Sequence, residues 1–166
     1  MIDADQLRTH IIKPVLQHLG MYSLAAENLV LGTWAVESEL GTYLRQIGGG
    51  PAMGAGQMEP VTHADIWRNW LAHQPETAEK LRQLVPPLYW TGDDDVPVDA
   101  DALIDLRYSC AMTRIHYRRA RPPLPAALDW PALEAYHKKY YNTPLGKTRP
   151  GEFIAAVRDC GVAQVV

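Results

Sequence analysis

Apolar residues recur along most of this chain at intervals of three and four positions, the period of a helix that buries one side. Proline and glycine separate these segments, and runs with the alternating pattern of a β-strand are scarce. A small β-hairpin is expected only within 41–58. No internal repeat and no linker divides the chain, so we expect one mainly α-helical domain over residues 1–166. The predicted helices cover residues 4–19, 23–41, 60–71, 75–85, 99–119, 131–141 and 151–160.

The second of these segments has the clearest helix signals. Ser23 is a preferred N-cap residue, and Gly41 is placed to end the helix in a left-handed turn. Glu39 points to the side that also carries Asn28 and Gly32, so we expect that side to face solvent. The opposite side carries apolar residues and one carboxylate: Ala26, Val30, Thr33, Trp34, Glu37 and Leu40.

Glu37 interrupts the apolar side of this helix and is the first candidate for chemistry. A buried carboxylate must be paired, hydrogen-bonded or protonated, because burying it bare costs too much free energy. Partial desolvation favours the protonated form of a glutamate, which suits a general acid. Two interpretations follow from position alone: an internal glutamate satisfied by an arginine or a backbone N–H, or a catalytic acid.

A glycine-rich segment follows this helix, with five glycines among the nine residues 48–56. Glycine permits close approach of the backbone to a ligand, and such a loop between two helices is a common place for a binding groove. The segment is not a phosphate-binding loop, because no Lys-Ser or Lys-Thr pair follows the last glycine and no strand precedes it.

Three motifs follow one another along the chain: Glu37-Ser38, the segment Gly54 to Thr62, and the pair Tyr141-Asn142 followed by a glycine. Together they resemble motifs of the lytic transglycosylase and goose-type lysozyme superfamily. The first is the pair Glu37-Ser38 at a helix C-terminus. The second is Gly54-Ala-Gly-Gln57-Met-Glu-Pro60-Val-Thr62, similar to the family's Gly-x-x-Gln-x-x-Pro-x-Thr segment. The third is a Tyr-Asn pair followed by a glycine, Tyr141-Asn142-Thr-Pro-Leu-Gly146, although Tyr136 also fits the family's tyrosine. Within the superfamily, the chain is most similar to the small lysozyme-like domains of tailed phages.

This resemblance implies a lysozyme-like catalytic domain that cleaves peptidoglycan between N-acetylmuramic acid and N-acetylglucosamine. Glu37 would protonate the glycosidic oxygen and then accept the proton of the muramic 6-hydroxyl, giving a 1,6-anhydro product. Tyr136 or Tyr141 would orient Glu37, and Gln57 and the backbone around Met58 would hold N-acetyl groups. The substrate-binding residues that the resemblance implies are Ser38, Gln57, Met58, Tyr136, Tyr141 and Asn142.

Two positions depart from the family pattern. Gly56 replaces a larger side chain, and Glu59 stands where many members have methionine. Glu59 is either an exposed residue before a helix or a second carboxylate near the groove that tunes Glu37. In a hydrolase, Glu59 or one of the aspartates would position a water molecule. The alternatives to a lytic transglycosylase are therefore a hydrolytic muramidase and a non-catalytic module that binds glycan in a phage virion.

Composition and charge limit the classes of molecule that this chain is expected to bind. The net charge of −3 gives no electrostatic attraction to nucleic acid, and no apolar stretch is long enough to span a membrane. We expect no secretory signal, because no apolar run follows a basic N-terminus. The resemblance then implies synthesis in the host cytoplasm during phage production, and either release by a holin or delivery in the virion. The partners would be glycan strands and, in a virion, other phage proteins, and the isolated chain is expected to be a monomer.

No cofactor or metal is predicted. The six histidines lack the spacing of a metal motif, and there is no Cys-x-x-Cys pair. Cys110 and Cys160 have apolar neighbours in predicted helices, which favours free thiols over a disulfide. Tryptophans stack well on sugar faces, but Trp34 and Trp70, at helical spacing, are more typical of a core.

Overall fold

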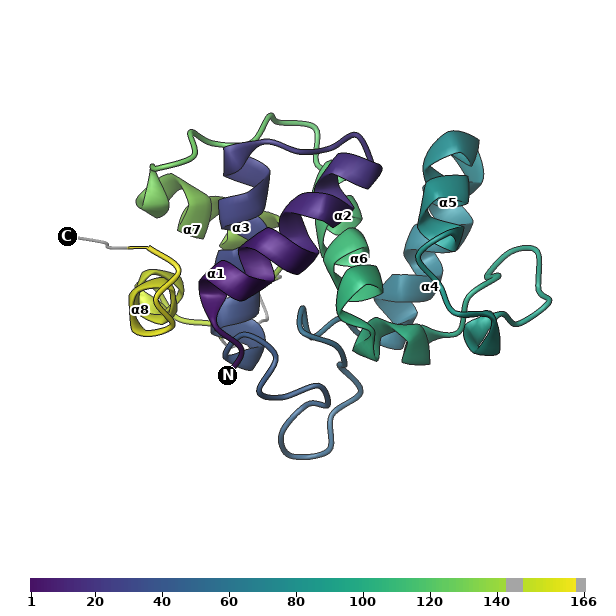
Figure 1. The fold of residues 1–166 in the computed structure, drawn as a ribbon, viewed down its shortest axis with the longest axis horizontal. Helices are drawn as coiled ribbons and strands as arrows, with labels where there is room; N and C mark the ends of the chain where they lie inside the picture. Colours follow the sequence, from purple (N-terminus) through teal and green to yellow (C-terminus); the bar gives the residue numbers. More distant parts are fainter. Residues whose placement is uncertain (143–147, 164–166) are drawn as a thin grey trace.

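The computed structural model describes residues 1–142 and 148–163. Over these residues the chain forms one mainly α-helical domain with essentially no strands, which confirms the predicted class (Figure 1). The helical segments in chain order are α1 (Ala4–Leu7), the π-helical turn η1 (Arg8–Ile12), α2 (Lys13–His18), α3 (Leu24–Ser38), α4 (Pro60–Asn69), η2 (Leu71–His73), α5 (Pro75–Arg82), η3 (Pro87–Tyr89), η4 (Ala100–Ile104), α6 (Leu106–Arg118), α7 (Trp130–Tyr140) and α8 (Glu152–Asp159).

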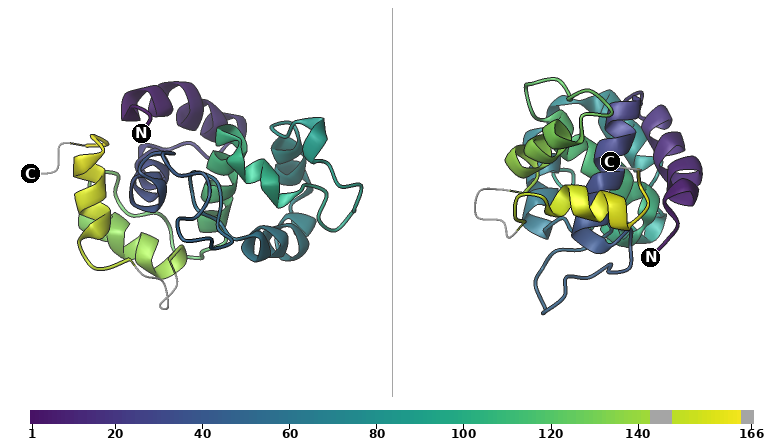
Figure 2. Two further views of the ribbon diagram at one scale, coloured as in Figure 1. Left: turned by 90° about the horizontal axis from the view of Figure 1, so that it is seen from below. Right: turned by 90° about the vertical axis from the view of Figure 1, so that its left-hand side faces the viewer.

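Helix α3 is the centre of the domain. It packs against α2, α6, α7 and α8, which surround it in Figures 1 and 2. Eleven of its fifteen residues are buried, so it is a core helix rather than a surface helix with one apolar side. Its N-terminus is capped as predicted, because the Ser23 hydroxyl accepts the Ala26 N–H at 3.1 Å.

The prediction that the Asn28 and Gly32 side of α3 faces solvent is wrong. The ring of Phe153 from α8 lies on Gly32, at a distance that a side chain at this position would not allow. Asn28 accepts a hydrogen bond from Arg8 at 3.0 Å, and the same arginine forms an ion pair with the buried Glu27. The polar groups on this side are thus buried because they have partners.

The end of α3 also differs from the prediction. The helix stops at Ser38, and Glu39 is already left-handed, with φ of 50°. Leu40 and Gly41 follow with φ of 52° and 79°, so the left-handed turn is longer than a single glycine cap. Glu39 is exposed, as predicted. This early end places Glu37 in the last turn of the helix.

The expected interruption near Pro14 takes the form of a π-helical turn. The Lys13 N–H donates to Arg8 O, five residues back, immediately before the proline. Proline has no N–H to donate and crowds the preceding turn, and the wider π-helical turn accommodates both effects.

The long helix expected over 99–119 is divided in two. Asp105 is extended, with φ of −72° and ψ of 125°, and its carboxylate accepts the backbone N–H groups of Arg107 and Tyr108. It therefore caps a new helix, α6, after the short 3-10 helix η4. The sequence contained this N-cap residue, but the apolar period continues across it.

The small β-hairpin expected within 41–58 is present only as isolated backbone bridges, Arg45 with Met53 and Met53 with Met58. The many glycines make the segment a folded-back loop rather than a pair of strands. This loop projects from the C-terminal end of α3 (Figures 1 and 2).

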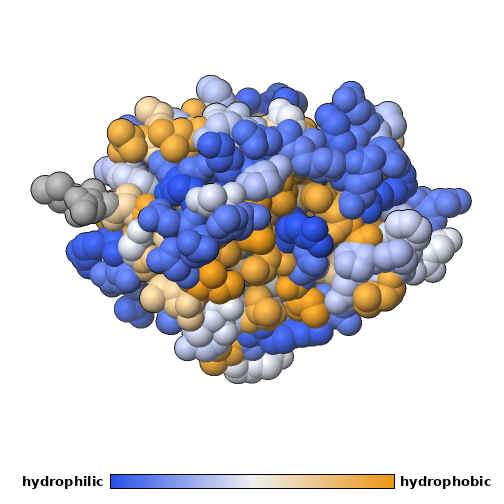
Figure 3. Space-filling view, viewed as in Figure 1, coloured by the Kyte–Doolittle hydropathy of each residue, from blue (hydrophilic) through white to orange (hydrophobic). Residues whose placement is uncertain are grey.

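Cys110 is buried and Cys160 is partly buried, and neither forms a disulfide within the described residues. Among the described residues, no helix combines the length and the apolar composition needed to cross a bilayer. Hydrophobic side chains reach the surface across the middle of one face, between hydrophilic margins (Figure 3).

The contact between Phe153 and Gly32 leads to a stability prediction. An alanine Cβ at position 32 would lie 2.3 Å from Cζ of the Phe153 ring, which is itself fully buried. We expect Gly32→Ala to lower the free energy of unfolding by about 1–3 kcal/mol, although alanine is otherwise the better helix former by about 1 kcal/mol. Denaturant titration measures the change.

Phe153→Leu provides the matched background for this test, because leucine lacks the tip of the ring. In that background, Gly32→Ala should cost less than it does in the unaltered protein. A gain in stability from Gly32→Ala alone would contradict the packing described.

Candidate active site

An open cleft with a volume of about 610 Å³ lies beside the C-terminal end of α3. Its walls come from the end of α3, the glycine-rich loop, the start of α4, the last turns of α6 and the segment after α7. The cleft thus joins parts of the chain that are far apart in sequence. Its lining residues are Glu37, Tyr43, Gln46, Ile47, Ala52, Gln57, Met58, Glu59, Thr62, His116, Tyr141, Asn142 and Thr148.

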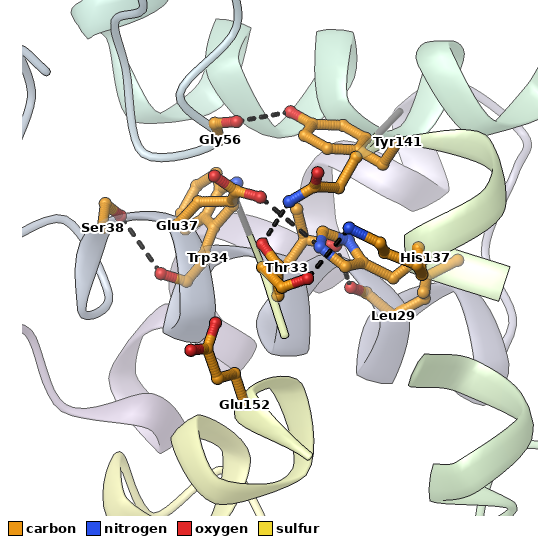
Figure 4. Close-up of polar contacts among 12 residues, drawn as sticks. Leu29, Thr33, Trp34, Glu37, Ser38, Gly56, His137, Tyr141 and Glu152 are labelled. Atoms are coloured by element: carbon orange, nitrogen blue, oxygen red, sulfur yellow. Dashed lines mark hydrogen bonds and ion pairs between the residues drawn. The ribbon is translucent and has the colours of Figure 1, made fainter. Parts of the chain in front are cut away.

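Glu37 opens into this cleft, with 20% of its side chain exposed. Its contact partner is His137 of α7, whose Nε2 lies 3.4 Å from Glu37 Oε1 (Figure 4). Within the described part of the chain, no arginine and no backbone N–H pairs with this carboxylate. The arrangement therefore differs from an internal glutamate held by a structural cation, and it leaves the carboxyl group accessible to a ligand.

Ser38 does not line the cleft, contrary to its expected place among the substrate-binding residues. Its side chain is 2% exposed, and its Oγ lies 2.7 Å from Ala55 O and accepts the Gly41 N–H at 2.9 Å. Ser38 therefore attaches the glycine-rich loop to the end of α3. Its part in the site is to position that loop next to Glu37.

The neighbours of position 56 explain why it is a glycine. A Cβ at this position would lie 2.4 Å from Thr113 Oγ1 and 2.6 Å from Tyr141 Oη. The Tyr141 hydroxyl donates a hydrogen bond of 2.6 Å to Gly56 O. The missing side chain is thus what lets the loop backbone reach Tyr141.

Gln57 lines the cleft, in a left-handed conformation with φ of 45°. Its side-chain Nε2 donates to Gly54 O at 3.0 Å and to Tyr43 O at 3.1 Å. Both amide hydrogens are used in this way, so the group that Gln57 presents to a ligand is the acceptor Oε1.

Met58 also borders the cleft, but its backbone is already paired. The Met58 N–H donates to Met53 O, and the Met53 N–H donates to Met58 O, both at 3.0 Å. The expectation that the backbone around Met58 holds an N-acetyl group is therefore not met by its N–H. What Met58 offers to the cleft is its side chain.

The two candidate tyrosines have different positions. Tyr141 lines the cleft, whereas the Tyr136 hydroxyl donates to Pro122 O at 3.0 Å and the residue is not part of the lining. Of the two, Tyr141 is therefore the one placed near Glu37. Asn142 lines the cleft and donates to Thr148 Oγ1, while Gly146 of the same motif lies outside the described residues.

Glu59 is exposed at the rim of the cleft, immediately before α4. Its side chain makes no capping hydrogen bond to that helix. A second carboxylate thus borders the same cleft as Glu37. None of the five tryptophans, all within the described residues, lines the cleft.

His137 and His116 were not predicted as site residues, because their spacing matches no metal motif and they belong to none of the three motifs. A usable signal was present: His137 lies four residues before Tyr141 and four after Leu133, so the three share one side of a helix. Among the described residues, no three His, Cys, Asp or Glu side chains gather as metal ligands would.

Three buried polar atoms around the cleft have no hydrogen-bond partner among the described residues: His116 Nδ1, His137 Nε2 and Asn142 Oδ1. Such atoms are rare in folded proteins and mark places where a ligand or solvent completes the bonding. Two further such atoms belong to Arg114, which does not line the cleft, so three of the five found among the described residues lie around it. This distribution supports the cleft as the functional site.

Electrostatics in the cleft follow mainly from burial. Burial, and then the negative charge of Glu37, raise the pKa of the Tyr141 phenol above its ordinary value. Burial, and then Arg119, lower the pKa of His116 to about 4. At neutral pH both side chains are therefore uncharged, and Glu37 and Glu59 are the acidic groups of the lining.

Comparisons of this chain with protein families, characterised proteins and solved structures give no match. The assignment of a function therefore depends on the geometry of the cleft and on the motifs in the sequence.

Buried histidines predict how stability depends on pH. Burial lowers the pKa of both His63 and His116 from 6.5 to about 4, so the unfolded chain binds protons that the folded chain does not. Their contribution to stability is complete above pH 6.5 and is lost as the pH falls toward about 4. Each histidine contributes up to about 3 kcal/mol across this window, at about 1.4 kcal/mol per pKa unit.

Denaturant titrations at about pH 7 and about pH 4.5 measure this loss. The variant His116→Gln should show a smaller difference between the two conditions. Equal free energies of unfolding at both pH values in the unaltered protein would contradict the prediction.

Proposed function

We propose that this protein cleaves the glycan strand of peptidoglycan at the bond between N-acetylmuramic acid and N-acetylglucosamine, as a lytic transglycosylase. The observation that carries the proposal is that Glu37 and Gln57, from two separate motifs, line one open cleft. The Tyr141-Asn142 pair of the third motif borders the same cleft. Motifs with no common site would be expected to scatter over the surface.

The proposed reaction needs one carboxyl group. Glu37 donates its proton to the glycosidic oxygen as the bond between this oxygen and the muramic C1 breaks. The muramic 6-hydroxyl then attacks C1, and its proton passes to the Glu37 carboxylate. The products are a 1,6-anhydromuramic end and a free N-acetylglucosamine end, and Glu37 recovers its proton.

The remaining lining residues support this chemistry through binding. Gln57 Oε1 is an acceptor suited to the N–H of an N-acetyl group, since both hydrogens of its own amide are used within the loop. Tyr141, fixed to the loop by its hydrogen bond to Gly56 O, borders the space in which Glu37 acts. Tyr43 and Ile47 supply exposed apolar surface for sugar faces.

A hydrolytic muramidase is the second candidate, favoured by Glu59 at the rim of the same cleft. Glycoside hydrolases ordinarily use two carboxyl groups, one as acid and one as nucleophile or as base for water. In a phage, either activity would serve lysis of the host after holin release or entry from the virion.

Replacement of the acid tests the proposal directly. Glu37→Gln keeps the size of the side chain but removes the proton donor, so clearing of purified sacculi should fall by at least ~10²-fold. Glu39→Gln is the matched control, because Glu39 is an exposed residue two positions away and does not line the cleft. Loss of activity in Glu39→Gln with activity retained in Glu37→Gln would overturn the assignment.

Digestion in H₂¹⁸O separates the two chemistries. A lytic transglycosylase uses no water as nucleophile, so mass spectrometry should find muramic ends that carry no heavy isotope and are lighter by one water. Incorporation of ¹⁸O at the new reducing ends would favour the muramidase. Binding to sacculi without any soluble product would instead identify a non-catalytic glycan-binding module.

A further inference from the structure

A chain of short hydrogen bonds extends from the core of the domain to His137. The Thr33 hydroxyl donates to Leu29 O at 2.7 Å, and Thr33 Oγ1 lies 2.6 Å from Tyr117 Oη. Tyr117 Oη lies in turn 2.8 Å from His137 Nδ1. Thr33 and Tyr117 are buried, and His137 is 0% exposed, so solvent does not complete these bonds (Figure 4 shows Thr33 and His137).

The number of hydrogens available along this chain determines which ring nitrogen of His137 carries a hydrogen. Three short contacts need three hydrogens, because two oxygen lone pairs facing each other at such distances repel. Leu29 O has none to give, and the hydroxyls of Thr33 and Tyr117 supply one each. The third hydrogen must come from His137, on Nδ1. Burial raises the pKa of the Tyr117 phenol, so this hydroxyl keeps its hydrogen.

A neutral histidine that carries its hydrogen on Nδ1 has a lone pair on Nε2. That atom is the one that lies 3.4 Å from Glu37 Oε1 and makes no hydrogen bond to any described residue. It therefore faces the carboxyl group as a hydrogen-bond acceptor, which is a partner for the protonated form of that group. A general acid needs this protonated form before it meets its substrate.

We propose that His137 is a positioning residue for Glu37: the Leu29–Thr33–Tyr117 chain holds it as the Nδ1–H tautomer, so that one proton is retained between Glu37 and His137. The geometry alone determines the tautomer of the neutral ring. Its consequence for the reaction rests on the proposed function of Glu37. The opposite tautomer, with its hydrogen on Nε2, would donate to Glu37 and stabilise the carboxylate instead.

The other groups around His137 do not determine its tautomer in place of the Leu29–Thr33–Tyr117 chain. Helix α6 contributes the uncharged His116 beside Tyr117, and Tyr141 stacks on the imidazole with ring centres 5.6 Å apart. Helix α8 contributes the apolar ring of Phe153, 5.1 Å away. Among the described residues, Glu37 is thus the only carboxyl group that contacts the histidine.

The tautomer can be read without any activity measurement. Long-range ¹H–¹⁵N correlation spectra of protein containing ¹⁵N-labelled histidine distinguish the two ring nitrogens, and comparison with His137→Gln assigns the signals. We expect Nδ1 of His137 to carry the hydrogen at neutral pH. Observation of the Nε2–H tautomer would overturn the proposal.

Thr33→Val tests the chain, since valine has nearly the same shape but no hydroxyl. The Tyr117 hydrogen is then donated to His137 Nδ1, and the histidine should change to the Nε2–H tautomer. The alkaline limb of the plot of kcat against pH should move to lower pH by about one unit. At pH values above this limb, kcat should then be about tenfold lower, with KM unchanged. A changed tautomer with an unmoved limb would overturn the link to Glu37.

Tyr108→Phe is the matched control. Tyr108 is also buried in α6, and its hydroxyl lies 2.7 Å from Nε2 of another histidine, His63, outside the cleft. This variant loses a buried hydroxyl next to a histidine, but it should leave the His137 tautomer and the pH limb in place. If the unaltered protein does not cleave sacculi, the spectra still decide the tautomer, so failure of the proposed function remains distinct.

Discussion

The burial of α3 on every side is the constraint on which the rest of the structure depends. A helix buried all round must find a partner for each polar group it carries, and α3 carries several. Glu27 and Asn28 are satisfied by Arg8, Thr33 by Tyr117, and Ser38 by the glycine-rich loop. Each of these contacts brings another part of the chain to α3.

Glu37 is the polar residue of α3 that this packing does not fully satisfy. It lies in the last turn, where the helix leaves the core and the chain turns left-handed at Glu39. One side of its carboxyl group meets the buried His137, and the other opens into the cleft. A group held in this way is fixed in place and still accessible, which is the combination that proton transfer to a bound ligand requires.

Much of the fold could be predicted because it depends on local signals. The period of apolar residues, the Ser23 cap and the proline-rich breaks place most helices within a few residues. The predictions are wrong where more than one local signal determines the structure. Phe153 covers the side of Gly32 that was expected to face solvent. Asp105 caps a new helix and so divides a continuous apolar pattern. A single helix pattern holds no information about which other helix will cover it.

The candidate site was predictable only in part, because tertiary contacts also determine how its residues lie. The motifs identified Glu37, Gln57 and Tyr141, which line one cleft, but not the partner of Glu37, which lies 100 positions further along the chain. The pairing of Met58 with Met53 and the inward position of Ser38 depend on how the loop folds back. Spacing in the sequence does not specify that geometry.

The contact between Gly56 and Tyr141 has a consequence for how this chain can diverge. The loop carbonyl and the phenol are in hydrogen-bond contact only because position 56 has no side chain. A larger residue there would require a shorter side chain at 141 or a displaced loop, and either change would alter the shape of the groove beside Glu37. Positions 56 and 141 are therefore coupled through their contact, so a larger side chain at one calls for a compensating change at the other.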